Sequence, residues 1–201
     1  GDTLTAIAGE KAGILKSGVP AVIAPQVPEA MAAIDRRARE VGAPLVSVVE
    51  RFADARIEPA TEGRYRLEGG GYDVIVPLRG RYQATNAMTA ILLAEQLRAA
   101  GLPVSREAIL DGIAHAEWPG RLELLSVGEP ARWVLLDGAH NAAGAAVLAE
   151  FLRTHFADRP VTMIFAAMAD KEIGAMARAL FPLADRLILT RVDSPRAADP
   201  K

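Results

Sequence analysis

The amino-acid sequence predicts a protein of the α/β class. Short apolar segments of strand length alternate along the chain with longer segments whose apolar residues recur at helical spacing. Proline and glycine residues stand at most of the breaks between these segments. Of the 201 residues, 51% are hydrophobic, which is enough to form a substantial core in one large domain or two small ones.

The composition excludes several functional classes. The chain has 23 basic and 25 acidic side chains, a formal net charge of -2 and no run of five like charges, so we expect no nucleic-acid binding. The absence of cysteine excludes disulfides, thiolate metal sites and cysteine nucleophiles, and it is compatible with the cytoplasm, where we place the protein. No apolar stretch is long enough to cross a membrane.

The first part of the chain reads as helix, strand, helix, strand. The spacing predicts a helix over residues 3–16, with Asp2 or Thr3 as its N-cap, and a strand over residues 19–24. A second helix is expected over residues 28–41, because Pro28 suits its first turn and Gly42 its C-cap; a strand over residues 45–49 follows.

A β-hairpin and two helices are expected next. Residues 65–76 alternate apolar and polar side chains around a turn at residues 69–71, which predicts a hairpin at a sheet edge. The three glycines of this turn do not form a phosphate-binding loop, since no Lys-Ser/Thr pair and no helix follow them. The two helices are predicted over residues 84–100 and 105–115, as an antiparallel pair.

A domain boundary is expected at residues 117–121, where Pro-Gly interrupts both helix and strand. Beyond it the pattern predicts strands over residues 122–127, 133–137, 161–166 and 186–190, and helices over residues 142–155 and 172–180. The last three strands alternate with the helices as in half of a Rossmann-like fold. We therefore expect their carboxyl ends to share one edge, with Asp137, His140, Asn141, Asp170 and Lys171 just beyond it.

The densest group of polar side chains is Asp137-Gly-Ala-His140-Asn141, between a strand and a helix. Small residues there let the backbone approach a ligand, which favours a binding loop. The alternative is that Asp137 only caps the following helix and His140 is an exposed loop residue. Arg121, at the domain boundary, is either a phosphate ligand reaching across a cleft or an ordinary surface arginine.

Two further residues have both a structural and a functional interpretation. Lys11 can be a solvated cation near a helix C-terminus, where positive charge is favoured, and local sequence supports that reading best. Asn86 lies in the first turn of the predicted helix over residues 84–100, so it is either a capping residue or a ligand contact.

Five segments, in this order, closely resemble those of the folylpolyglutamate synthase/dihydrofolate synthase family of Mur ligases. They are GDTLTAIAGEKAGILKSGVP at 1–20, GRYQATNAMTA at 80–90, WPGRLELL at 118–125, DGAHNAAGA at 137–145 and MADKEI at 168–173. The first segment is the most specific to the folate branch, because other Mur ligases share the later asparagine and arginine positions. The resemblance extends over nearly the whole chain.

The resemblance implies a role for each candidate residue. Lys11 is similar to a lysine that is carbamylated and helps to organise magnesium at the γ-phosphate of ATP. Asn86 matches a contact to adenine, Arg121 an arginine near the phosphates and Asp137 an acidic residue on the ribose side. His140 resembles a histidine near the reacting phosphate and the incoming glutamate.

The implied reaction is ATP-dependent addition of L-glutamate to the carboxylate of a folate or of dihydropteroate through an acyl phosphate. ATP and Mg2+ are the implied cofactors, and the implied partners are these small molecules, with no nucleic acid and no membrane. We expect a monomer.

The resemblance also implies the domain organisation. Residues 1–117 would be the C-terminal portion of a P-loop ATPase domain, with its hairpin near residues 64–76, residues 118–121 a hinge, and residues 122–201 the first part of a Rossmann-like ligase domain. The phosphate-binding loop, the acidic and histidine ligands of magnesium and the folate-binding loop would all precede residue 1. We therefore expect an internal fragment, truncated at both ends, that is inactive alone.

Two positions depart from the family pattern. Tyr82 stands where the family has histidine, and Ala142 stands where it has proline. The alternatives that stay open are another Mur-type amino-acid ligase, such as a peptidoglycan precursor ligase or cyanophycin synthetase, a nucleotide-binding module without catalysis, and an α/β domain with fortuitous loops.

Overall fold

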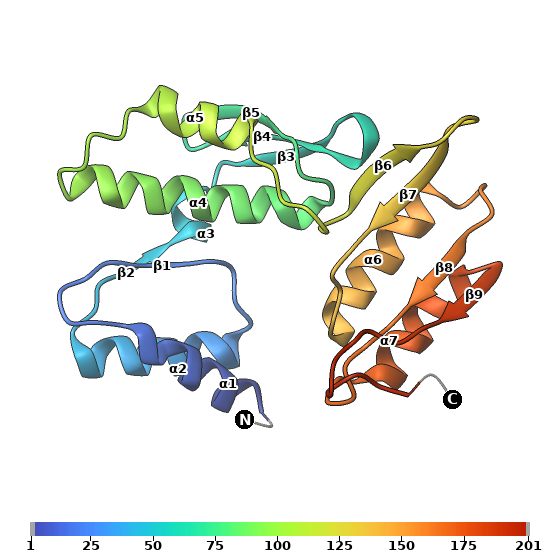
Figure 1. The fold of residues 1–201 in the computed structure, drawn as a ribbon. Coiled ribbons are helices and arrows are strands. Elements are labelled where there is room, and N and C mark those ends of the chain that lie inside the picture. The colour runs from blue at the N-terminus through green and yellow to red at the C-terminus, as the bar shows by residue number, and fades with distance from the viewer. Residues whose placement is uncertain (1–2, 200–201) are drawn as a thin grey trace. The chain divides into compact units, whose positions relative to one another are not determined.

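The computed structural model describes residues 3–199, which form two compact units of helices and strands (Figure 1). The first unit contains the chain up to Ala60 and the segments Arg64–Pro77 and Arg81–Ala116. The second contains Thr61–Gly63, Leu78–Gly80 and the chain from Glu117 onward. The predicted α/β class is confirmed in both units.

The first unit places a parallel strand pair and a helix pair beside an antiparallel sheet with its own helices. Its elements are α1 (Leu4–Lys11), η1 (Ala12–Ile14), β1 (Ala21–Ile23), α2 (Pro28–Val41), β2 (Leu45–Ser47), α3 (Val48–Arg51), β3 (Arg56–Pro59), β4 (Tyr65–Gly69), β5 (Tyr72–Val76), α4 (Arg81–Ala99) and α5 (Arg106–Ala114). β1 and β2 pair in parallel, whereas β3, β4 and β5 form an antiparallel sheet in that order.

The α2 helix has the predicted bounds because both of its ends are specified by the sequence. Pro28 occupies the first turn, where its missing N–H is not needed, and Gly42 adopts the left-handed conformation, φ 72°, that ends the helix. Small buried residues, Ala30 and Ala33, pack against Ala8 of α1. The N-cap of α1 is Thr3, whose side chain accepts from the N–H of Ala6; Asp2 lies outside the described residues.

The helix α4 packs along the three-stranded sheet (Figure 1). Leu67 of β4 and Ile91 and Leu92 of α4 are almost completely buried. Burial of each such side chain stabilises the fold by about 1.5–3 kcal/mol. The alternation of buried and exposed residues along β4 and β5 confirms the predicted hairpin.

A half-buried polar network ties α3 and the hairpin to α4. Glu95 accepts two hydrogen bonds from Arg51, at 2.8 and 3.1 Å, and one from the Tyr72 hydroxyl at 3.1 Å. Arg51 also donates to the carbonyl of Gly70 in the hairpin turn. Burial, followed by the neighbouring Glu95 carboxylate, raises the pKa of the Tyr72 phenol, so this hydroxyl keeps its proton and stays a donor.

We expect Gly69→Ala to destabilise the protein by about 3 kcal/mol or more. A Cβ at this end of β4 would lie 2.5 Å from the Cα of Ala55. This neighbour is a backbone atom, so it cannot move aside as the end of a flexible side chain could. The control is Gly112→Ala in α5, where a Cβ meets no heavy atom within 4 Å. Urea denaturation checks the pair, and a G69A variant as stable as the wild type would contradict the packing described for this turn.

The second unit contains two strand pairs and two helices. Its elements are η2 (Thr61–Gly63), β6 (Glu123–Val127), β7 (Arg132–Leu136), α6 (Ala142–His155), β8 (Thr162–Phe165), α7 (Ile173–Leu180), η3 (Phe181–Leu183) and β9 (Arg186–Leu189). The helices pack on each other through Ala145 and Ala149 of α6 and Met176 and Leu180 of α7. Alanines on one face of α6 let the two helices approach closely.

The predicted common edge of three parallel strands is wrong. β8 and β9 pair in parallel as expected, but β7 forms an antiparallel hairpin with β6, and no ladder within residues 3–199 joins β7 to β8 or β9. Alternation of strands and helices indicates strand direction, but strands consecutive in sequence are neighbours only about two-thirds of the time. Asp137 and His140 therefore follow one sheet, and Asp170 and Lys171 follow another.

Other elements also differ from those expected. The first helix ends at Lys11 and continues only as the short 3-10 turn η1. The elements α3 and β3 were not predicted, and α3 begins at Val48, inside the apolar run that predicted a strand over residues 45–49. The helix α4 begins at Arg81 rather than at residue 84, which removes Asn86 from the first turn.

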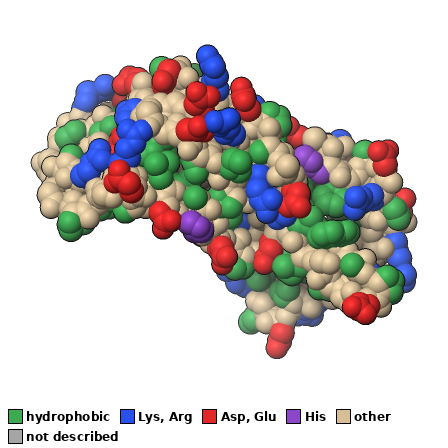
Figure 2. All heavy atoms as spheres, turned by 90° about the horizontal axis from the view of Figure 1, so that it is seen from above, with side chains coloured by type: hydrophobic (Ala, Val, Ile, Leu, Met, Phe, Trp, Pro, Cys, Tyr) green, Lys and Arg blue, Asp and Glu red, His purple; other side chains and the backbone are tan. Residues whose placement is uncertain are grey.

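No described helix combines the length and apolar character that a membrane span requires. Acidic and basic side chains are intermingled on the face that Figure 2 displays, in keeping with the nearly balanced charge of the chain.

Candidate functional site

The loop that follows β7 is fastened to the segment that precedes β6. The N–H of Gly138 donates to the carbonyl of Gly120 at 2.8 Å. The carboxylate of Asp137 accepts from the N–H of Leu122 at 2.9 Å through one oxygen and from the N–H of Ala139 at 2.8 Å through the other. We call residues 120–122 and 137–140 the clasp, since these bonds join the two segments that flank the open end of the β6–β7 hairpin.

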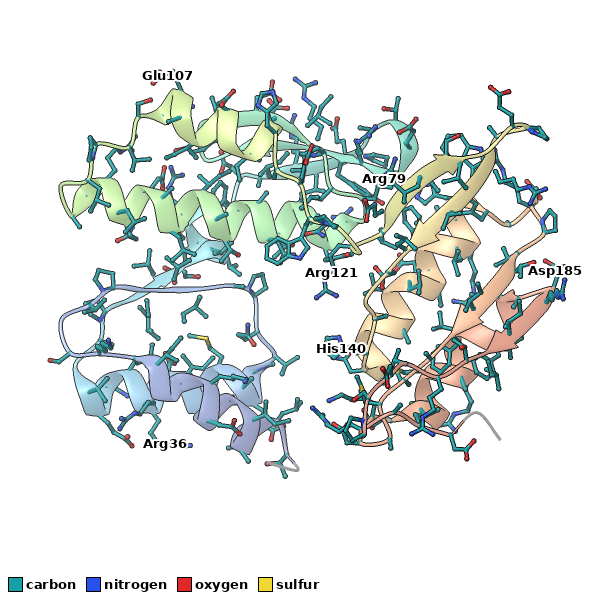
Figure 3. The ribbon with its side chains drawn as sticks, viewed as in Figure 1. Arg36, Arg79, Glu107, Arg121, His140 and Asp185 are labelled. Atoms are coloured by element: carbon teal, nitrogen blue, oxygen red, sulfur yellow. The ribbon has the colours of Figure 1, made fainter. Side chains whose placement is uncertain are left out.

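Arg121 and His140 meet at a single oxygen of the clasp. The carbonyl of Gly138 accepts from Nη1 of Arg121 at 3.3 Å, and Nδ1 of His140 lies 2.9 Å from the same oxygen. Because a carbonyl can only accept, Nδ1 of His140 carries a proton in this contact, which leaves Nε2 as the ring nitrogen that can accept when the ring is neutral. A guanidinium and an imidazole are thus held on one backbone group; both residues are labelled in Figure 3.

The backbone of the clasp is strained at one position. Leu122 has φ 46° although it is not glycine, and its side chain is only 1% exposed. Such a conformation costs about 1–3 kcal/mol, so the surrounding contacts must impose it. The bond from its N–H to Asp137 and the burial of its side chain are the contacts that do so.

The cap of α6 is Asn141 and not Asp137. The side chain of Asn141 accepts from the N–H of Gly144 at 2.8 Å, which satisfies a donor of the first turn. The alternative in which Asp137 only caps this helix is therefore wrong, because both oxygens of that carboxylate bond to the clasp. His140 is exposed, as that alternative also supposed.

A second charged group lies beyond β8 and β9. Asp170 accepts from Nη2 of Arg196 at 2.9 Å and pairs with Nζ of Lys171 at 2.9 Å. The hydrogen bonds from Lys171 and then from Arg196 lower the pKa of Asp170 to about 2. The N–H of Ala169 also donates to the carbonyl of Arg196, so the two loops are joined through backbone and side chains.

The lowered pKa of Asp170 predicts a stability difference that depends on pH. Since the folded pKa lies below the ordinary value of 3.8, the contribution of Asp170 is complete above about pH 4 and disappears as the pH falls toward 2. The difference in melting temperature between wild type and Asp170→Asn should therefore be present at pH 6 and vanish near pH 2. A difference that is equal at both pH values would show that the charge of Asp170 does not stabilise these loops.

The two candidate residues of the first unit occupy helices. Lys11 is the last residue of α1 and its side chain is exposed. Asn86 lies in the second turn of α4, where its Nδ2 donates to Oε1 of the buried Gln83 at 2.8 Å. The interpretation of Asn86 as a capping residue is wrong, because the helix begins five residues earlier at Arg81.

The structure thus brings three of the predicted residues together, Arg121, Asp137 and His140, and places Lys11 and Asn86 in the other unit. Sequence reasoning missed Gly138 as the shared partner of Arg121 and His140, and Leu122 as the strained residue. For Gly138, the only signal in the sequence was that the loop contains a glycine. A leucine with positive φ gives no local signal, since the conformation is imposed by tertiary contacts.

The comparisons with known proteins define the class. Residues 120–201 match the family described as Mur ligase, glutamate ligase domain, a match that begins at the first residue of the clasp. This match assigns residues 120–201 to the Mur ligases.

Over nearly its whole length the chain is similar to the folylpolyglutamate and dihydrofolate synthases of this family. It is 36% identical over 203 residues to the dihydrofolate synthase/folylpolyglutamate synthase of Bacillus subtilis, covering 98% of this chain and 46% of that protein. A structure of Mycobacterium tuberculosis folylpolyglutamate synthase complexed with ADP matches with a TM-score of 0.82 and 32% identity, over 99% of this chain and 45% of that one. E. coli FolC in complex with DHPP and ADP matches with a TM-score of 0.74 and 30% identity, over 98% of this chain and 44% of that one. The chain spans about half the length of the relatives it matches.

Proposed function

We propose that the full-length protein uses ATP to ligate L-glutamate to the carboxylate of a folate or of dihydropteroate. The observation that carries this proposal is the clasp, which holds an arginine and a histidine on one carbonyl in a chain whose relatives are folate ligases crystallised with ADP. In the proposed reaction a carboxylate oxygen of the acceptor attacks the γ-phosphorus of ATP and releases ADP. The amine of glutamate then attacks the acyl carbon, and the bond to phosphate breaks.

In this proposal the clasp residues act on the phosphates and on the amine. Arg121 lies near the phosphates, because a guanidinium is always charged and matches the geometry of oxyanions. His140 stands near the reacting phosphate and the incoming glutamate, where Nε2 of the neutral ring can accept a proton from the amine. No covalent intermediate with the protein is required.

Asp137 and Asn86 are proposed to bind the nucleoside. Each carboxylate oxygen of Asp137 accepts one backbone N–H, which leaves lone pairs for a ribose hydroxyl. Asn86 is exposed, and its amide both donates and accepts, as recognition of an adenine edge requires. The proposed domain roles are therefore ATP binding for residues 1–117 and ligation for residues 122–201, with residues 118–121 as the hinge.

Lys11 is proposed to contribute to magnesium binding only as a carbamate. An unmodified ammonium repels a cation, whereas a carbamate offers the oxygen ligands that magnesium prefers. No cluster of three His, Asp or Glu side chains that could hold a metal occurs within residues 3–199. When bound, magnesium would neutralise charge on the γ-phosphate. We also propose that the protein is cytoplasmic and acts as a monomer.

An initial-rate assay of the full-length protein tests the proposal. ATP and L-glutamate are supplied with dihydropteroate, with tetrahydrofolate or with a UDP-muramyl acceptor, and ADP release and product are both measured. We expect turnover with one or both of the first two acceptors. Turnover only with the muramyl acceptor would assign the protein to another kind of Mur ligase, and ADP binding without turnover on any acceptor would favour a nucleotide-binding module.

A further inference from the structure

Gly138 is the residue at which the contacts of the clasp converge. Its N–H donates to the carbonyl of Gly120 at 2.8 Å, and its own carbonyl oxygen lies 3.3 Å from Nη1 of Arg121 and 2.9 Å from Nδ1 of His140. Because both side chains use the same oxygen, a displacement of either changes the environment of the other. The proposed function assigns Gly138 itself no role in binding or catalysis.

The absence of a side chain at position 138 leaves the space that Arg121 occupies. A Cβ built there would lie 3.2 Å from Nη1 and 3.7 Å from Cζ of Arg121, and 3.5 Å from the carbonyl oxygen of Gly120. The distance of 3.2 Å to Nη1 is shorter than an ordinary van der Waals contact, whereas the 3.5 Å to the Gly120 oxygen is an ordinary contact. The backbone of Gly138 is outside the left-handed region, so alanine can adopt it without strain.

The added methyl group would therefore move the guanidinium and leave the backbone in place. The contacting atoms belong to the far end of a flexible side chain, which can rotate at small cost. The bond from Arg121 to the Gly138 carbonyl, already long at 3.3 Å, would be the first to be lost. The contacts of Asp137 with Leu122 and Ala139 do not involve this space.

We propose that Gly138 is a positioning residue for Arg121: its missing side chain and its carbonyl fix the guanidinium beside His140. The proposal rests on the function proposed above, in which Arg121 lies near the phosphates of ATP. Recognition of an oxyanion by a guanidinium depends on where its N–H groups point, so Gly138 would control nucleotide affinity without touching the nucleotide.

A double-mutant cycle in the full-length protein tests this role. ADP binding is measured by calorimetry for the wild type, Gly138→Ala, Arg121→Ala and the double variant, and KM for ATP is measured beside it. We expect G138A to weaken ADP binding roughly threefold to tenfold, the net contribution of about one hydrogen bond. The double variant should bind ADP no more weakly than R121A alone. Gly174→Ala in α7, whose Cβ would meet only Nη1 of Arg178 at an ordinary 3.5 Å, is the matched control.

A readout that does not depend on the nucleotide separates the two proposals. The Nε–H resonance of Arg121, identified by its loss in R121A, is compared between wild type and G138A in protein labelled with nitrogen-15 arginine. We expect this resonance to shift in G138A and not in G174A. An unchanged resonance, or a loss of ADP affinity on adding G138A to R121A, would overturn the positioning role. A shifted resonance in a protein that neither binds ADP nor ligates glutamate would support that role and reject the proposed function instead.

Discussion

Replacing Asp137 by alanine is expected to lower the free energy of unfolding by about 2–4 kcal/mol and to reduce kcat/KM for ligation at least about a hundredfold. The substitution removes both carboxylate oxygens of Asp137, so the N–H groups of Leu122 and Ala139 lose their partners together. Leu122 would then leave its strained conformation, and the segment that carries Arg121 would move with it. Thermal unfolding and initial rates in the full-length protein measure the two effects.

Asparagine at position 137 separates the contribution of the two bonds. Its amide has one acceptor oxygen and one donor group, so Asp137→Asn can keep only one of the two backbone bonds. We expect the free energy of unfolding of D137N to lie between those of the wild type and D137A. The control is Asp158→Ala, an exposed aspartate of the same unit. If D137A were as stable as D158A, the clasp would not depend on this carboxylate.

The second large effect is expected at Lys11, in activity rather than in stability. Lys11 is exposed at the end of α1, so Lys11→Ala should change the free energy of unfolding by less than about 0.5 kcal/mol. As the proposed source of a magnesium ligand, it should nevertheless be required for ligation, with a loss of at least about a hundredfold. The two measurements together distinguish a functional lysine from a solvated one.

Lys16 provides the matched control for this substitution. It is also exposed, and it lies beyond the 3-10 turn that ends the first helical segment. Lys16→Ala should leave ligation unchanged. Bicarbonate labelled with carbon-13 gives a second readout, because a carbamate signal should appear in the wild type and in K16A but not in K11A. Full activity of K11A would reject the role of Lys11, whatever its state of modification.

The sequence predicted best those elements whose ends have chemical markers. The helix α2 has the expected bounds because a proline and a glycine mark where it begins and ends, and the apolar spacing predicted the bounds of α6. The elements α3 and β3 were missed, and the start of α3 at Val48 lies inside an apolar run that favoured a strand. The pairing of β7 with β6 was also missed, because neighbours in a sheet are chosen by tertiary packing and not by strand patterns.

The candidate site could be predicted as a set of residues but not as an arrangement. Asp137, His140 and Arg121 were identified because their polar side chains stand next to glycines in loops. The bonds that join them run through backbone groups, which carry no side-chain signature in the sequence. The positive φ of Leu122 and the convergence on Gly138 became visible only with the folded chain.

The most direct test of the proposed reaction follows the oxygen atoms of the acceptor. The acceptor found in the initial-rate assay is prepared with oxygen-18 in its carboxylate and incubated with the full-length protein, ATP and L-glutamate. Because the amine expels phosphate from an acyl phosphate, each molecule of inorganic phosphate should contain one oxygen from the acceptor. Inorganic phosphate without oxygen-18, formed in step with the ligated product, would contradict the account.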